Sequence, residues 1–156
     1  MNSEPPNLAL HISEELKETK QLLERIQEVS QKLEQSVDPL YVESLALNLH
    51  GFYNGLERIF LQIATHIDRT LPKGSNWHQE LLNQMHTELP TVRPAVISQN
   101  TLTSLKEYRG FRHVVRNVNP LQLDIDKVKP LALQAESVFT QVSEELLAFV
   151  DFLEGH

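Results

Sequence analysis

Several features are missing from this sequence, and each absence excludes a class of protein. The 156 residues include no cysteine, so disulfide bonds and thiolate metal sites are excluded. No stretch approaches the run of roughly 18 uncharged apolar residues that spans a membrane. The first seven residues also lack the order of a signal peptide, in which positive residues precede apolar ones. We therefore expect a soluble, cytoplasmic protein.

The seven histidines are too scattered to form a metal site on one helix. None lies three or four residues from another, which is the spacing at which a helix presents two ligands to the same ion. We expect neither a metal ion nor another cofactor.

Apolar residues recur at spacings of three and four along most of the chain, which is the period of an amphipathic helix and not of a strand. Five stretches show this pattern, at about residues 8–36, 38–70, 76–89, 99–118 and 124–153. The sequence thus predicts an all-α, up-and-down helical bundle of about five helices. It should form a single domain over residues 8–154 behind a loose tail of residues 1–7.

Prolines and acidic capping residues mark where three of these helices begin or end. Asp38-Pro39 places an N-cap directly before a proline at the first helical position. Asn119-Pro120 should end the fourth helix, because proline disfavours helical backbone in the residue before it. Asp124 or Asp126 is expected to cap the fifth helix, with Pro130 tolerated in its first turn.

The second helix carries two glycines and three polar residues that each suggest a contact. Gly51 and Gly55 lie four apart, and each costs about 1 kcal/mol relative to alanine inside a helix, which implies that another backbone comes close. His50, Tyr53 and Glu57 project from a single face. They either line a ligand-binding groove, with Glu57 orienting an arginine, or form an ordinary solvated or interface face.

Positive charge is concentrated in one part of an otherwise acidic chain. Between Arg93 and Arg116, five Lys or Arg residues stand against one acid, Glu107, which is a net charge of +4, so the rest of the chain carries −11 to give the total of −7. A local cationic region on an anionic body suggests a phosphate-bearing ligand bound at one place, and not a protein that coats nucleic acid.

The fourth helix separates this charge from its apolar residues. Arg109, Arg112, His113 and Arg116 fall within a stripe about 100° wide. The opposite side carries Tyr108, Phe111, Val114, Val115 and Val118. One face is expected to bind an anion and the other to pack, unless the arginines pair with acids of neighbouring helices or of a partner chain. Arg93, in the preceding loop, would reach the ligand, and Tyr108 would either stack on a base or belong to the core.

Three chemistries fit such a cationic face. Metal-independent RNA cleavage by the neighbouring 2′-hydroxyl needs proton transfer and a cation beside the phosphate, roles that histidine and arginine fill. The second is binding of a nucleic acid or nucleotide without catalysis. The third is a protein–protein interface at which the arginines meet acidic side chains.

Four segments resemble the HepT-like group of HEPN-domain proteins. They are residues 47–60 (LNLHGFYNGLERIF), Trp77-His78, Arg93-Pro94 and residues 108–118 (YRGFRHVVRNV). The resemblance spans about residues 40–130. It implies an α-helical bundle that dimerises and acts as a ribonuclease toxin on RNA such as tRNA or mRNA. It also implies neutralisation by an MNT-type nucleotidyltransferase antitoxin, in some cases by AMPylation of the toxin.

The signature of that family is an arginine, four to six residues, a histidine, one residue and a tyrosine. On this sequence it begins at Arg112 and meets Asn117 where the histidine belongs and Asn119 where the tyrosine belongs. Asparagine can bond a phosphate or ribose but exchanges no proton at neutral pH, and Asn119 has no phenol to accept AMP. Either His113 has taken over proton transfer, or the chain is a weakened or inactive member that binds RNA, a nucleotide or a partner protein. The alternative register, from Arg109 to His113, is one residue too short.

Residues five apart on a helix differ by about 140° in direction, so Arg112 and Asn117 do not share a face. A working site therefore needs the helix to end or bend near Asn117, which Pro120 favours, or a second subunit to complete it. A twofold dimer would join two cationic faces into one cleft. Arg112 would hold the scissile phosphate, Arg109 and Arg116 would add phosphate contacts, and the acidic first helix would dock a basic partner such as the antitoxin.

Overall fold

The computed structural model describes residues 7–117 and 119–155, apart from the side chains of His113, Arg116, Asn117 and Pro120. Its five α-helices are α1 (Leu8–Gln35), α2 (Pro39–Ile63), α3 (Trp77–His86), α4 (Gln99–Asn117) and α5 (Ile125–Leu153). Within these described ranges, the only strand-like pairing is an isolated bridge between Leu89 and Arg93. The predicted all-α bundle of about five helices is confirmed.

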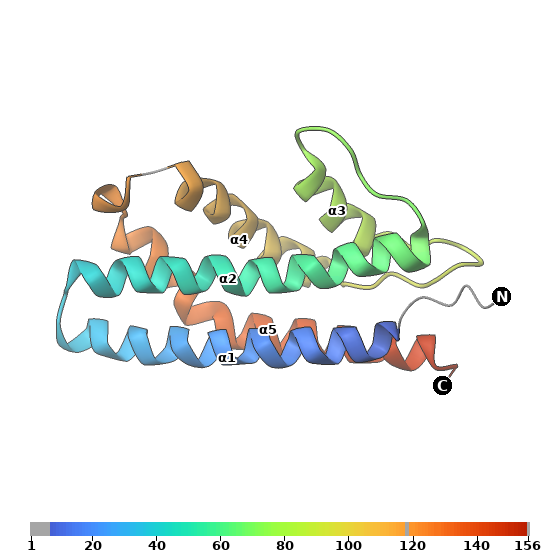
Figure 1. The fold of residues 1–156 in the computed structure, drawn as a ribbon, viewed down its shortest axis with the longest axis horizontal. Coiled ribbons are helices and arrows are strands. Elements are labelled where there is room, and N and C mark those ends of the chain that lie inside the picture. The colour runs from blue at the N-terminus through green and yellow to red at the C-terminus, as the bar shows by residue number, and fades with distance from the viewer. Residues whose placement is uncertain (1–6, 118, 156) are drawn as a thin grey trace.

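The three long helices α1, α2 and α5 pack side by side, and α4 with the short α3 covers the side of α2 that faces away from α1 (Figure 1). α1 and α2 run antiparallel, and the start of α1 lies at the same end of the bundle as the end of α5. The apolar stripes of the helices meet in one core, in which Ile26, Phe52, Phe60, Leu105 and Leu146 are fully buried. None of the helices in the described ranges is long and apolar enough to cross a membrane.

Acidic side chains cap α2 and α5 as the sequence predicts. The carboxylates of Asp38 and Asp124 accept hydrogen bonds from the backbone N–H groups of Leu40 and Asp126, each 2.9 Å long. Each bond satisfies a donor that would otherwise be free in the first helical turn. The first residues of both helices are therefore set by local chemistry.

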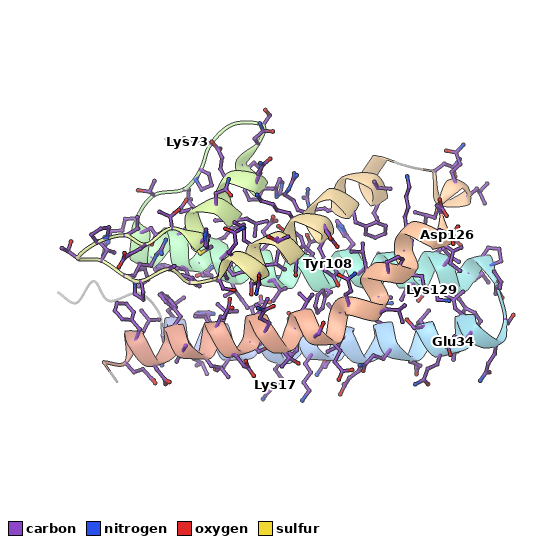
Figure 2. All side chains as sticks on the ribbon, turned by 180° about the vertical axis from the view of Figure 1, so that it is seen from behind. Lys17, Glu34, Lys73, Tyr108, Asp126 and Lys129 are labelled. Carbon is purple, nitrogen blue, oxygen red and sulfur yellow. The ribbon has the colours of Figure 1, made fainter. Side chains whose placement is uncertain are left out.

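Pro130 lies deeper in α5 than predicted. Because Asp124 is the cap and Ile125 the first helical residue, the proline occupies the second turn and not the first. Its missing N–H removes the usual bond to the carbonyl of Asp126, and its ring crowds that carbonyl, so the helix bends. α5 changes direction near the labelled Lys129 (Figure 2). The expected place of Pro130 was therefore wrong.

The two glycines of α2 face α1. A Cβ built on Gly55 would stand well inside contact distance of Thr19 Oγ1, and one built on Gly51 would lie 3.2 Å from Leu22 Cδ1. Thr19 is buried, and its hydroxyl donates to the Glu15 carbonyl at 2.8 Å, so it does not turn away freely. The two glycines thus make room for side chains of α1, whereas the prediction named another backbone.

Gly55→Ala is expected to lower the free energy of unfolding by about 1 kcal/mol, because the cost of overpacking exceeds the gain in helix propensity. Gly110→Ala, in α4, is the matched control, since no described atom lies within 4 Å of its built Cβ. The control should keep or raise stability. Adding Thr19→Ala to Gly55→Ala should relieve the clash. Urea unfolding measures all of these variants, and equal effects of the two glycine substitutions would contradict the close packing.

α4 is fixed against α5 at two places. At its start, the Glu145 carboxylate accepts hydrogen bonds from the Ser98 backbone N–H and the Thr101 hydroxyl, both 3.0 Å long. In its middle, the Tyr108 hydroxyl donates to the Leu131 carbonyl at 2.7 Å. These contacts fix the rotation of α4 about its own axis and therefore decide which of its side chains turn toward α2.

Candidate functional site

Tyr53 and Glu57 lie one turn apart on α2 and are polar residues inside the bundle. Tyr53 is 1% exposed and Glu57 is 6% exposed. His50, one turn earlier on the same helix, is half-buried. The possibility that this is an ordinary solvated face is therefore wrong, and the polar groups need partners from the helices that cover α2.

Among the described side chains, Glu57 pairs with a histidine of α3 and not with an arginine as expected. His78 brings its Nδ1 to 2.7 Å from Glu57 Oε2. The ring of Trp77 packs against that of His78 at a tilt of 32°, with centroids 3.5 Å apart, and Trp77 also packs against the core. The Glu57 side chain is 7% exposed and that of His78 is 17% exposed, so the carboxylate lies inside and the imidazole nearer the surface.

The charges of Arg109 and Arg112, both on α4, influence the Tyr53 hydroxyl. Burial has the largest effect on the Tyr53 phenol and raises its pKa far above the ordinary value. The charge of Glu57 raises that pKa further, whereas the charges of Arg109 and Arg112 lower it. The phenol is therefore neutral at physiological pH and presents a hydrogen-bond donor among three charged groups.

Several donors in this region have no acceptor in the part of the chain that the structure describes. The Tyr53 hydroxyl and the Nε atoms of Arg109 and Arg112 are buried and lack a hydrogen-bond partner there. Leaving a buried donor unpaired costs about 1–3 kcal/mol, and guanidinium groups favour anions that offer two oxygens. The arrangement is suited to bind a phosphate. We name it the α2–α4 cluster, which consists of Tyr53, Glu57, His78, Arg109 and Arg112.

Tyr53→Phe is expected to leave the free energy of unfolding unchanged or slightly higher, because it removes a buried hydroxyl with no partner in the described residues. If the protein binds RNA and that hydroxyl donates to one of its phosphates, the variant should bind the RNA about 2- to 12-fold more weakly, which corresponds to one hydrogen bond. Urea unfolding and RNA binding by fluorescence anisotropy measure the two effects. A marked loss of stability with unchanged RNA binding would contradict this role.

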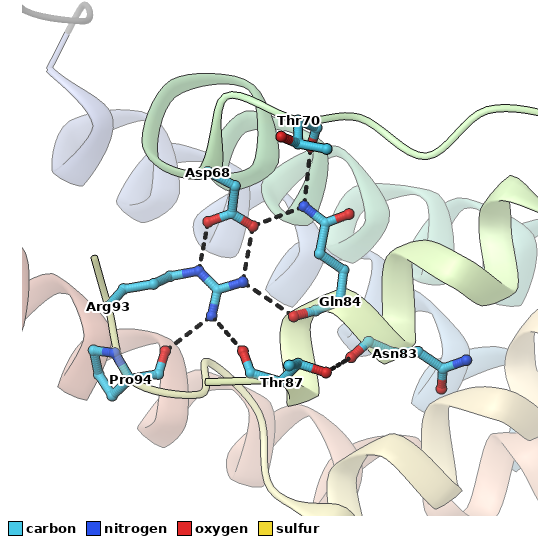
Figure 3. A network of polar contacts seen from close by, with 7 residues as sticks. All are labelled: Asp68, Thr70, Asn83, Gln84, Thr87, Arg93 and Pro94. Atoms are coloured by element: carbon cyan, nitrogen blue, oxygen red, sulfur yellow. Dashed lines mark hydrogen bonds and ion pairs between the residues drawn. The ribbon is translucent and has the colours of Figure 1, made fainter. Parts of the chain in front are cut away.

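Arg93 is not available to a ligand, which corrects the sequence-based prediction. Its side chain is 0% exposed and forms a two-pronged ion pair with Asp68, with distances of 2.6 Å from Nε to Oδ1 and 2.8 Å from Nη2 to Oδ2. Asp68 ends a π-helical turn, η1 (Ala64–Asp68), that continues α2. The other donors of Arg93 bond the carbonyls of Gln84, Thr87 and Pro94 at 2.9–3.0 Å (Figure 3). Arg93 thus ties the loop between α3 and α4 to the end of α2.

Tyr108 belongs to the core and not to a base-stacking surface. It is 1% exposed, its ring centroid lies 5.7 Å from that of Phe52, and its hydroxyl is bonded to α5 (Figure 2). Phe111 is also buried, and Val114 and Val115 pack against the core, as predicted for the apolar side of α4. Of the two roles expected for Tyr108, the place in the core is confirmed, and base stacking on RNA is wrong.

The motif positions lie at and beyond the end of α4. The helix ends at Asn117, close to the end that the following proline predicts. Asn119 is exposed, and its Oδ1 accepts the Leu121 backbone N–H at 2.9 Å, so its side chain is engaged in the turn after the helix. Outside the described part of the structure lie Val118 and the side chains of His113, Arg116 and Asn117. What the sequence predicts for them stays a prediction.

His78 is the residue of the cluster that sequence reasoning did not select. It lies 21 residues from Glu57, so no helical or strand period connects the two. The one available signal was Trp77-His78 within the segments that resemble the HepT-like group. An aromatic ring next to an imidazole at the start of a helix indicates a packed histidine, but not its partner.

Comparison with known proteins assigns the chain to a family. Residues 44–153 match the family model described as HepT-like protein, which is more than half of the chain. The match includes α3, α4 and α5 and most of α2. No curated protein and no solved structure matches the chain. The chain therefore belongs to the HepT-like family, as the resemblance in its sequence indicates.

Proposed function

We propose that this HepT-like protein is a ribonuclease of the HEPN toxin type, which binds RNA at the α2–α4 cluster and cleaves it without a metal ion. The observation that carries the proposal is the pair of buried Nε atoms, from Arg109 and Arg112, that have no acceptor among the described residues. A phosphodiester supplies the missing oxygens in the geometry that guanidinium groups favour. In this proposal Arg112 holds the scissile phosphate, and Arg109 and Arg116 add contacts to phosphate.

Cleavage uses the 2′-hydroxyl beside the scissile phosphate as its nucleophile. Negative charge grows on the phosphate oxygens during the attack, and fixed arginines stabilise that charge more than they stabilise the starting phosphate. The neutral Tyr53 phenol adds a donor to the same oxygens. Removal of the 2′ proton requires a base, and the imidazoles of His50, His78 and His113, which lie on α2, α3 and α4, are the candidates.

We further propose that two copies associate around α4 and that an MNT-type nucleotidyltransferase antitoxin silences the protein. A dimer is supported by the angle of about 140° that separates Arg112 from Asn117 on one helix, because a second copy can complete the site. α1 offers the antitoxin a docking surface for basic residues through exposed acids, among them Glu14, Glu18, Glu24 and Glu28. Transfer of AMP to residue 119 is not expected, because Asn119 has no phenol.

The second candidate function is binding of RNA, a nucleotide or a partner protein without catalysis. It is favoured by Asn117 and Asn119, which stand where the family signature has its histidine and tyrosine. Neither amide transfers a proton at neutral pH. The Asn119 side chain is engaged in a turn, which is a structural task.

One assay separates these two functions. The purified protein is incubated with total cellular RNA in EDTA, and its binding to the same RNA is measured at low and high salt. Cleavage in EDTA supports the ribonuclease. Intact RNA with binding that weakens as salt rises supports the non-catalytic function. Absence of both cleavage and binding rejects an RNA-directed use of the cluster.

A further inference from the structure

We propose that His78, oriented by Glu57, is the general base of this site and removes the proton from the attacking 2′-hydroxyl. The inference rests on the ribonuclease function proposed above. It gives the site the proton acceptor that Asn117 cannot provide. His78 and Glu57 come from different helices, so only the packing of α3 against α2 brings them together.

The hydrogen bond to Glu57 decides which nitrogen of His78 can act as a base. With Nδ1 2.7 Å from Glu57 Oε2, the neutral ring carries its proton on Nδ1 and donates it to the carboxylate. The lone pair then lies on Nε2, which has no hydrogen-bond partner among the described residues. The carboxylate also stabilises the imidazolium that forms when the proton arrives, as in other histidine–carboxylate pairs.

Packing holds the pair in place and leaves the imidazole accessible. The Glu57 side chain is 7% exposed, so the surrounding helices enclose it and keep it beside His78. The indole ring of Trp77 packs against the imidazole in a tilted arrangement, with a centroid distance of 3.5 Å, and restricts the orientation of that ring. The His78 side chain is 17% exposed, which leaves a ligand a way to approach it. A buried carboxylate behind a partly exposed imidazole suits general-base catalysis.

The pair belongs to the same cluster as the two arginines. Glu57 is one helical turn from Tyr53, and the charges of Glu57, Arg109 and Arg112 all act on the Tyr53 hydroxyl. α3, which carries His78, packs against both α2 and α4. In the proposal, a phosphate held by Arg109 and Arg112 lies beside α3, and His78 is the imidazole that α3 contributes there.

The other histidine of α3 has a different task. His86 lies in the last turn of that helix and bonds the Ile97 carbonyl through its Nδ1 at 3.1 Å. It therefore holds the loop that leads into α4 and is not placed beside Glu57. His78, in contrast, contacts the α2–α4 cluster directly through Glu57.

In the proposed reaction the 2′-oxygen attacks phosphorus while its proton moves to Nε2 of His78. The bond between phosphorus and the 5′-oxygen breaks, and the 5′-oxygen takes a proton from water. The products are a 2′,3′-cyclic phosphate and a 5′-hydroxyl end. The imidazolium of His78 then returns its proton to the hydroxide that is left.

The test is cleavage of one labelled oligoribonucleotide in EDTA by the wild type, His78→Ala and His78→Asn, with and without added imidazole. Both variants are expected to lose about 100-fold or more in kcat, with KM nearly unchanged. His78→Asn keeps a donor for Glu57, so it preserves the fold if His78→Ala does not. Imidazole should restore part of the rate of His78→Ala, because it occupies the space that the side chain leaves. His11→Ala is the matched control, since His11 is exposed on α1.

Glu57 is a positioning residue in this proposal and has its own test. Glu57→Gln is expected to lower kcat less than His78→Ala does, and to gain nothing from imidazole, because the ring of His78 is still present. Glu57→Asp keeps a carboxylate and should retain more activity than Glu57→Gln. Equal losses in the two Glu57 variants, together with equal losses of stability, would mean that Glu57 acts only in packing.

The outcomes separate this inference from the proposed function. If the wild type cleaves RNA and both His78 variants cleave equally well, the ribonuclease remains and the base is another group, for which His113→Ala is the next variant. If His78→Ala loses activity and stability together and imidazole restores nothing, His78 is structural and the inference fails. If the wild type does not cleave RNA, the ribonuclease proposal itself fails, and with it the role of His78 as its base.

Discussion

Arg93→Met is expected to lower the free energy of unfolding by about 3–5 kcal/mol, the effect of removing one partner of a buried ion pair. The Asp68 side chain is 1% exposed. In the variant, its remaining side-chain donor among the described residues is the Gln84 amide, whose Nε2 lies 2.7 Å from Asp68 Oδ2. A charge stranded in this way has lost both water and its counterion. The loop between α3 and α4 also loses its tie to η1, so the contact of His78 with Glu57 should weaken as well.

Arg58→Met is the matched control for this variant. Arg58 also forms an ion pair, at 3.0 Å from Glu15, but its side chain is 53% exposed. The same substitution should therefore cost less than about 1 kcal/mol there. Adding Asp68→Leu to Arg93→Met should recover part of the loss, because no buried charge then remains. Urea unfolding measures all of these variants, and equal, small losses from the two arginine variants would show that burial adds nothing to the pair.

Arg112→Ala is expected to lower kcat for RNA cleavage by about 100- to 1000-fold, as removal of a group that stabilises transition-state charge does. RNA binding should weaken less, because other cations share the contacts with phosphate. Arg112→Lys should keep part of the binding but little of the rate, since an ammonium group cannot form the two parallel bonds of a guanidinium. Single-turnover cleavage and RNA binding measured on the same preparations separate the two effects.

Arg25→Ala is the matched control for Arg112→Ala. Arg25 is exposed on α1, and α2 lies between α1 and α4 (Figure 1). The control changes the net charge by the same amount and should leave kcat unchanged. Light scattering on each variant shows whether the oligomeric state is kept. Cleavage by Arg112→Ala as fast as that by Arg25→Ala would remove Arg112 from the reaction.

The helices could be predicted from the spacing of apolar residues along the chain, and a close contact of α2 could be predicted from its glycines. Apolar residues at intervals of three and four follow the helical period whatever they pack against, and Asp38 starts a helix through a bond to its own neighbour Leu40. Gly55 indicated a close contact because glycine weakens a helix interior. Its partner, Thr19, could not be named, since the lateral position of α1 on α2 depends on long-range packing.

The two ion pairs Arg93–Asp68 and His78–Glu57 could not be predicted, because their partners are distant in the sequence. Arg93 lies 25 residues from Asp68, and His78 lies 21 residues from Glu57. Counting charge along the chain groups Arg93 with the arginines of α4. In the fold, its backbone pairs with Leu89 in a tight turn, and the guanidinium bonds the carbonyls of that loop instead.

The error at Pro130 arose from a choice between two caps that the sequence left open. Capping by Asp126 would have placed the proline in the first turn, where its missing N–H does no harm. The observed bond from the Asp126 N–H to Asp124 starts the helix two residues earlier. Two acids in such positions offer the same capping chemistry, so only the packing of α5 against its neighbours decides between them.

RNA cleavage through the 2′-hydroxyl at the α2–α4 cluster is the central claim, and one measurement tests it most directly. The wild-type protein is given an oligoribonucleotide in EDTA, and then the same oligonucleotide with a single 2′-deoxy substitution at the mapped cut site. Cleavage of the first substrate only, with a 2′,3′-cyclic phosphate and a 5′-hydroxyl as the new ends, is the predicted result. Cleavage of neither substrate, or of both at equal rates, would contradict the claim.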